Sequence, residues 1–127
     1  MIHSLFIVNS AGAIVIEKHW RTATSRAVVD FFWGKLQECK RPKDLPPVLT
    51  GPKDYLINIC RGSLYYVATA TQEVTPLSII ELLHRIVDIF EIYFSSSSED
   101  VLKQNFATIY QILDEILDNG LPYITEP

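Results

Sequence analysis

Four consecutive apolar residues, Leu5 to Val8, lie in a short segment of strand-forming residues, SLFIVNS, and they restrict the possible folds more than any other feature. A strand with one face in water alternates apolar and polar side chains, whereas a continuous apolar run suits a strand covered on both faces. The next β-branched segment, AIVIEKHW, follows the turn-forming residues Asn9 to Gly12, so the pair predicts a β-hairpin. We therefore expect a sheet that lies between helical layers.

A second pair of strand-like segments, YLINIC and SLYYVATAT, flanks Arg61 and Gly62. A two-residue connection with a glycine, which tolerates positive φ, is typical of a tight hairpin. The preceding loop, RPKDLPPVLTGPKD, holds four prolines. These prolines exclude a helix but are compatible with a short edge strand at Val48 to Thr50.

Three segments have apolar residues at helical spacing. The first runs from Ser25 to about Cys39 without an internal proline. The second, Pro76 to Phe94, has its proline in the first turn, where the missing N–H does no harm. The third begins at a cap formed by Ser98 and stops at Asn119 and Gly120.

The predicted order is strand, strand, helix, three strands and two helices, and nothing in it requires a parallel βαβ unit. The simplest fold for this order is a mainly antiparallel sheet with helices on both faces. We therefore predict one domain of the α/β (α+β) class that spans residues 1–127.

Several large apolar side chains fall outside the apolar stripes of these helices when each residue is placed about 100° from the last. In the third helix all apolar residues, Phe106 included, fall in one half. Phe31 and Trp33 project to either side of the first stripe, and Leu77 and Ile92 fall among the polar residues of the second. Since burial is worth about 25 cal/mol per Å², these four are candidate protein-interface residues. Alternatively, Phe31 and Trp33 pack against the domain's own loop or sheet edge.

Composition excludes some classes of partner. A net charge of −4 and a pI near 5.3 argue against a nucleic-acid-binding domain. Hydrophobic residues make up 48% of the chain, which favours a folded domain. Cys39 and Cys60 lack the spacing of a disulfide framework or zinc site, so we expect buried, reduced thiols.

Membrane contact is expected to be peripheral. The longest apolar-rich stretch, Pro76 to Phe94, is interrupted by charged residues, and the N-terminus lacks the pattern of a targeting leader. A basic group at Lys40, Arg41 and Lys43 is interpreted as a solvated surface or as a contact for acidic lipid.

No motif indicates catalysis. His3, His19 and His84 do not belong to a metal-binding motif, and the glycines do not form a phosphate-binding loop. His84 lies at helical spacing from Glu81 and Asp88, which we interpret as a solvated helix face. We therefore predict no enzyme activity, no cofactor and no metal.

Three segments carry a resemblance to a known family: MIHSLFIVNSAGAIVIEKHW, QEVTPLSIIELLHRIVDIFEIYF and LDEILDNGLPYITE. Together they resemble the N-terminal longin domain of adaptor-complex medium (mu) subunits, most closely those of the third adaptor complex. The resemblance implies a five-stranded, mainly antiparallel sheet with one helix on one face and two on the other.

In function, the resemblance implies a non-catalytic assembly domain that binds a beta-type large subunit, within a heterotetramer that also holds a second large subunit and a sigma subunit. Such complexes are recruited with an Arf-type GTPase to the cytoplasmic side of Golgi and endosomal membranes, and they sort cargo towards lysosomes or vacuoles. Family members continue into a C-terminal domain that recognises tyrosine-based signals, whereas this sequence stops at Pro127. We therefore expect an excised domain, or alternatively a naturally short product, without that activity.

Three alternatives stay open. The first is a sigma-like subunit, and the second is the longin domain of a membrane-fusion (SNARE-type) protein, which would be followed by a coiled-coil segment. The third is a small enzyme or ligand-binding domain, which a ligand that stabilises the folded state would reveal.

Overall fold

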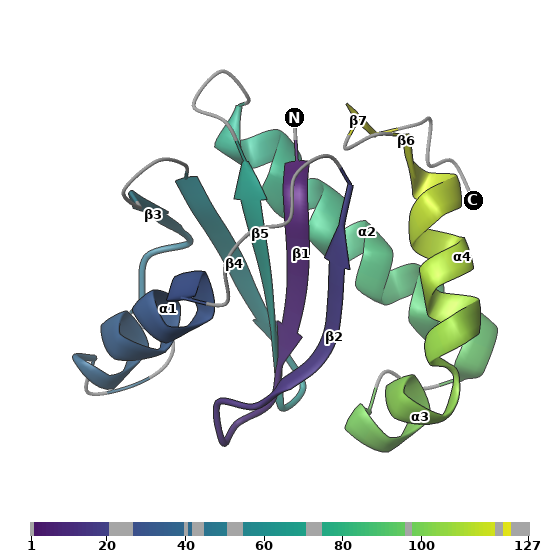
Figure 1. Ribbon diagram of the computed structural model, residues 1–127, viewed down its shortest axis with the longest axis horizontal. Helices are drawn as coiled ribbons and strands as arrows, with labels where there is room; N and C mark the ends of the chain where they lie inside the picture. The colour runs from purple at the N-terminus through teal and green to yellow at the C-terminus, as the bar shows by residue number, and fades with distance from the viewer. Residues whose placement is uncertain are drawn as a thin grey trace.

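Two antiparallel hairpins and one short edge strand build a five-stranded sheet at the centre of the protein (Figure 1). The strands of this sheet are β1 (Ile2–Val8), β2 (Ile14–His19), β3 (Val48–Thr50), β4 (Tyr55–Arg61) and β5 (Leu64–Ala70). They follow the spatial order β2-β1-β5-β4-β3, and every neighbouring pair is antiparallel. The predicted antiparallel sheet, both hairpins and the short edge strand are therefore confirmed.

The computed structural model describes residues 2–20, 27–39, 41, 45–50, 55–70, 75–95, 98–118 and 121–122, and of these it describes 117, 118, 121 and 122 by their backbone alone. The helices are α1 (Ala27–Gln37), α2 (Pro76–Phe94), α3 (Glu99–Gln104) and α4 (Phe106–Ile116). Two short strands, β6 (Leu117–Asp118) and β7 (Leu121–Pro122), form a separate antiparallel pair. The predicted stop at Asn119 and Gly120 and the basic residues Lys40 and Lys43 lie outside the described residues.

Strand β1 is covered on both faces, as its apolar run predicted. Leu5 and Ile7 pack into a core cluster with α2, α3 and α4, whereas Phe6 and Val8 pack into a second cluster with α1. Side chains alternate between the two faces of a strand, so a run of four apolar residues supplies both layers. Figure 1 shows α1 on one side of the sheet and α2 on the other.

The predicted third helix is interrupted, and the interruption lies at Asn105. This residue has φ −119° and ψ 24°, and its side-chain Nδ2 donates a hydrogen bond to the Val101 carbonyl at 2.8 Å. Asparagine side chains compete with the backbone for such bonds. The prediction of one continuous helix was therefore wrong, and Phe106, expected on the apolar half, is 56% exposed at the start of α4.

Two boundaries also differ from the predictions. Arg61 pairs with Leu64, so the tight turn consists of Gly62 and Ser63, with φ of 62° at the glycine. The helical segment that was expected to reach Asp118 ends at Ile116, because the next two residues pair with β7. The predicted cap is confirmed, since the Ser98 hydroxyl accepts a hydrogen bond from the Val101 N–H.

Helix α2 crosses the sheet as one uninterrupted element of 19 residues. Its buried stripe includes Ile79, Leu83, Ile86 and Phe90, which helical spacing places along one face. No helix in the described part of the chain is both long and apolar enough to cross a membrane.

A polar link connects the first hairpin to α3. The Asn9 side-chain oxygen accepts hydrogen bonds from the backbone of Ala11 and Ala13, both at 2.9 Å, and so shapes the turn. The Asn9 side-chain nitrogen donates to Glu99 Oε2 at 3.2 Å, and Lys103 Nζ lies 2.8 Å from that oxygen. The hydrogen bond from Lys103, followed by that from Asn9, lowers the pKa of Glu99.

This link predicts a pH-dependent contribution to stability. A carboxyl group whose pKa is lower in the folded state stabilises that state above its unfolded pKa and stops doing so as the pH falls through its folded pKa. We expect Glu99→Gln to lower the urea midpoint at pH 7, and the difference from wild type to vanish well below the ordinary glutamate pKa of about 4.3. Circular dichroism during urea titration measures this difference.

The matched control is Glu115→Gln, which neutralises an exposed carboxylate on α4. It should shift the midpoint less than Glu99→Gln does at pH 7. Equal shifts for the two variants would assign the effect to net charge and not to the link.

Candidate protein-interaction surface

The four candidate interface residues divide between the two sides of the sheet. Phe31 and Trp33 lie on α1, whereas Leu77 and Ile92 lie on α2, which covers the opposite face (Figure 1). The structure therefore does not bring them together into one surface. Whether any of them binds a partner stays a prediction.

Trp33 packs against the domain's own first hairpin. Gly12 in the hairpin turn has φ 87°, and a Cβ atom placed there would lie 2.9 Å from Trp33 Cε2. The indole is half-buried and contacts the cluster formed around Phe32. These contacts agree with the alternative that Trp33 packs against its own domain and is not reserved for a partner.

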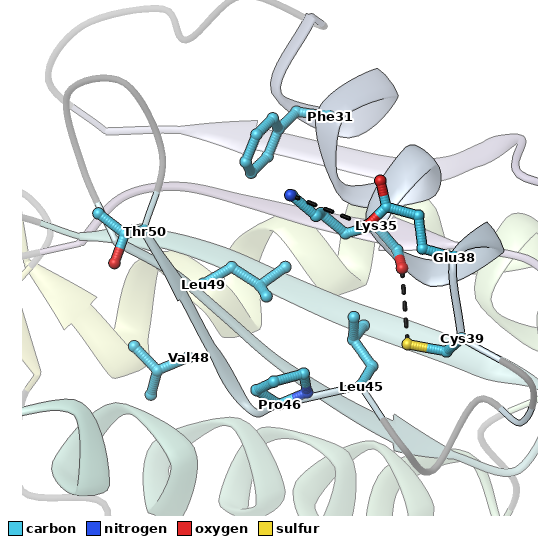
Figure 2. Close-up of a pocket in the computed structure, with 9 residues that line it drawn as sticks. All are labelled: Phe31, Lys35, Glu38, Cys39, Leu45, Pro46, Val48, Leu49 and Thr50. Carbon is cyan, nitrogen blue, oxygen red and sulfur yellow. Dashed lines mark hydrogen bonds and ion pairs between the residues drawn. The ribbon is translucent and has the colours of Figure 1, made fainter.

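Phe31 is half-buried at the edge of the same cluster. The Lys35 ammonium lies 5.6 Å from the centre of its ring, a cation–π distance. Phe31 also lines an open pocket between α1 and β3, with a volume of about 480 Å³ (Figure 2). The residues around this α1–β3 pocket are Phe31, Lys35, Glu38, Cys39, Leu45, Pro46, Val48, Leu49 and Thr50.

Leu77 and Ile92 are exposed, as their positions outside the stripe predicted. Their side chains are 61% and 72% exposed. Leu77 lies in the first turn of α2 and Ile92 in the last, a separation of about 22 Å at roughly 1.5 Å per residue. One partner that contacts both must therefore extend along most of the helix.

Periodicity alone missed a further exposed aromatic, Tyr93, which is 63% exposed. Its ring lies 6.3 Å from Phe94, which lies 6.4 Å from the buried Phe90. A row of aromatic rings therefore leads from the core to the surface at the end of α2. The sequence feature that could have indicated this exposure is the aromatic-rich ending FEIYF. At a helix end, a side chain close to the buried stripe can still lack a neighbour that covers it. We call Ile92 and Tyr93 the α2-end surface.

The carboxylates beside the α2-end surface are paired. Arg61 Nη1 lies 2.7 Å from Asp88 Oδ1, and Nη2 lies 3.5 Å from Glu91 Oε1. The hydrogen bond to Asp88 raises the pKa of Arg61, which keeps its charge at every physiological pH. A partner covering this region would bury charges that already have a counter-ion, which costs less than burying isolated charges.

Three hydrogen-bonded side chains have the residue types of a hydrolase triad, but the serine among them is not accessible to a substrate. The Ser4 hydroxyl lies 2.6 Å from His19 Nδ1, and His19 Nε2 lies 2.8 Å from Glu17 Oε2. Ser4 is opposite His19 in the β1–β2 pair and is 0% exposed. A nucleophile must reach its substrate. We therefore interpret these three hydrogen-bonded side chains as a polar link between two strands and not as a catalytic group.

The remaining candidate groups for chemistry do not cluster. Among the described residues no three His, Cys, Asp or Glu side chains are placed to hold a metal ion. Cys39 and Cys60 are both free thiols, but Cys39 is half-buried and Cys60 is exposed. The expectation that both are buried was wrong: Cys39 lies two residues beyond the end of α1, and Cys60 is the last residue but one of β4.

Comparison with known proteins places this fold among adaptor subunits. The pattern of the family described as clathrin adaptor complex small chain matches residues 1–126. The chain is 46% identical over 126 residues to the AP-3 complex subunit mu-2 of Rattus norvegicus and 44% identical to the AP-3 complex subunit mu-1 of Bos taurus. Each alignment covers 99% of this chain and 30% of the relative, so the chain spans about a third of these relatives' length.

Two structural neighbours share the fold. Both are chains from homology models of the full-length AP-3 complex. The first, from a stretched open conformation, has a TM-score of 0.73 at 20% identity and matches 99% of this chain and 86% of that chain. The second, from an intermediate open conformation, has a TM-score of 0.71 at 15% identity and matches 32% of that chain.

The contact between Trp33 and the hairpin turn predicts opposite effects for two glycine substitutions. Gly12→Ala introduces a side chain at positive φ and against the indole, and should destabilise the fold by about 1–3 kcal/mol. Gly34→Ala, in α1, adds a Cβ that meets nothing within 4 Å, and should stabilise by about 0.5–1 kcal/mol. Urea denaturation followed by circular dichroism measures both. Equal stabilities for the two variants would contradict the described packing.

Proposed function

Because the chain belongs to the clathrin adaptor complex small-chain family, we propose that it is a non-catalytic assembly domain of a heterotetrameric vesicle-coat adaptor complex. It serves intracellular protein transport from endosomes or the trans-Golgi towards lysosomes or vacuoles. The observation that carries this proposal is the 44–46% identity to AP-3 mu subunits across nearly the whole chain. Sequence identity this high across a complete fold favours a shared role and not merely a shared fold.

Within that complex we assign the chain to the medium (mu) subunit. The mu names of the curated relatives support this assignment. The alternative is a sigma-type subunit. The match to the small-chain family pattern and the 86% coverage of one neighbouring chain support this alternative. The same identities favour an adaptor subunit over the longin domain of a SNARE-type fusion protein.

The direct partner in this proposal is a beta-type large subunit, which binds the exposed face of α2. Leu77, Ile92 and Tyr93 are the exposed apolar side chains of that helix. Buried apolar side chains and aromatics carry most of the binding energy at protein interfaces, and truncating one that matters costs about 2 kcal/mol or more. The pairing of Asp88 and Glu91 with Arg61 lowers the cost of covering the region beside them.

The other partners follow from the complex and not from a site on this chain. They are a second large subunit, a sigma subunit and, indirectly, an Arf-type GTPase. Association with Golgi and endosomal membranes is peripheral and takes place through the complex on the cytoplasmic side.

The test is co-purification with the trunk of a beta-type large subunit. We expect Ile92→Ser with Tyr93→Ser to weaken binding by roughly 30-fold, since about 2 kcal/mol corresponds to that change in Kd. Isothermal titration calorimetry on the purified pair measures the change. Both side chains are more than half exposed, so the thermal melt of the isolated chain should change little.

The control is Phe106→Ser, which removes an exposed aromatic of similar exposure, 56%, from α4. It should leave Kd unchanged. Retained affinity in the α2 variant would remove the α2-end surface from the interface, and failure of the wild-type chain to bind any beta-type trunk would remove the proposal itself.

Phe31 and Trp33 are tested separately, because they lie on the opposite side of the sheet. If that side also contacts the large subunit, Phe31→Ala with Trp33→Ala weakens co-purification while the far-ultraviolet circular dichroism spectrum stays native. Unchanged co-purification would assign both side chains to packing within the domain.

A further inference from the structure

The face of α2 that points away from the sheet carries a continuous stripe of exposed side chains. With each residue placed about 100° from the last, these side chains fall within roughly 100° of one another and opposite the buried stripe. They are Leu77, Glu81, His84, Asp88, Glu91 and Ile92, which we call the α2 outer stripe. As far as Glu91 the residues of the stripe alternate between spacings of four and three. This is the spacing by which one helix packs lengthwise on another.

The α2 outer stripe is apolar at its two ends and acidic between them. Leu77 and Ile92 form the ends, and Asp88 and Glu91 share the Arg61 guanidinium. The third carboxylate, that of Glu81, is exposed and has no ion pair with any residue that the structure describes. The middle of the stripe therefore carries a negative charge that lacks a counter-ion in the described part of the chain.

The order of charges along the stripe opposes self-association. In an antiparallel pair of α2 helices that matches the apolar ends, Leu77 faces Ile92 of the second copy, and Glu81 faces Asp88. In a parallel pair related by a two-fold axis each residue faces itself, so Glu81 again faces a carboxylate. Like charges placed opposite one another are repulsive and suppress the wrong partner. A second copy of the chain therefore does not fit the stripe.

A surface that covers both apolar ends must also cover Glu81, because this residue lies between them. Enclosing a carboxylate without a counter-ion is strongly unfavourable, so the covering surface has to supply a positive charge there. The straight, lengthwise spacing of the stripe favours a helix as the covering element. A helix of about 15 residues spans the distance between Leu77 and Ile92, at roughly 1.5 Å per residue.

We propose that the element of the large subunit that covers α2 is an amphipathic helix with apolar side chains at both ends and a lysine or arginine opposite Glu81. This inference rests on the proposed function and names the chemistry of the partner at the same surface. Glu81 determines specificity, because its carboxylate attracts a basic helix and repels a second copy of the chain. The apolar contacts at Leu77 and Ile92 then fix the register of the partner helix.

The test is isothermal titration calorimetry of the purified chain against the trunk of a beta-type large subunit, at low and at high salt. At about 0.05 M salt, Glu81→Lys should weaken binding by roughly tenfold or more, because it sets two positive charges against each other. Glu81→Gln should weaken binding in the same direction and by less. At about 0.5 M salt the differences from wild type should shrink, since salt screens charges at the rim of an interface.

The matched control is Glu115→Lys, which makes the same change of net charge at an exposed position of α4. It should bind the trunk as wild type does. Because both carboxylates are exposed, the thermal melts of the Glu81 and Glu115 variants should stay close to that of wild type. A trunk variant in which a lysine or arginine is changed to glutamate should restore binding to Glu81→Lys.

The possible outcomes separate this inference from the proposed function. If Glu81→Lys binds as wild type does at low salt while Ile92→Ser with Tyr93→Ser still loses binding, the inference fails and the proposed function stands. Failure of the wild-type chain to bind any beta-type trunk would overturn both. Equal losses in Glu81→Lys and Glu115→Lys would assign the effect to net charge and overturn the role of Glu81. A wild-type dimer in sedimentation velocity that Ile92→Ser disrupts would assign the stripe to a second copy and also overturn the proposal.

Discussion

The packing of β1 on both of its faces is the constraint on which the rest of the structure depends. A strand whose consecutive side chains are all apolar is stable only with an apolar layer above and below it, because each exposed side chain would forgo about 1.5–3 kcal/mol. Leu5 and Ile7 require α2, α3 and α4, whereas Phe6 and Val8 require α1. The protein therefore has three layers, and each surface of the domain belongs to one outer layer or to an edge.

This layering separates the surfaces that are available to partners. The α2 side offers exposed apolar side chains beside paired charges, which suits a large, preformed protein surface. The α1 side carries an open pocket that is lined by residues of both α1 and β3. Helix α4 bonds to the β2 edge of the sheet, because its Tyr110 donates to the Glu17 carbonyl and its Asp114 pairs with Lys18.

Local pattern was sufficient for the sheet and insufficient for the helix ends and turns. The strand segments, the hairpins and the position of α2 follow from apolar periodicity and from turn residues, which act over a few neighbours. Asn105 interrupts a helical segment whose apolar spacing is continuous, because its side chain donates a hydrogen bond to the Val101 carbonyl. Tyr93 lies close to the buried stripe by angle but is exposed, since cover at a helix end depends on neighbours that are distant in sequence.

The sequence alone determined the class of fold, the layers around β1 and the absence of any motif for catalysis, because these depend on composition and on contacts between near neighbours. Only the tertiary structure decided what each surplus apolar residue does. Trp33 and Ile92 both lie outside the stripes of their helices, yet one packs on the Gly12 turn and the other faces solvent. Their different surroundings come from the placement of the first hairpin beside α1, a long-range contact that helical periodicity does not encode.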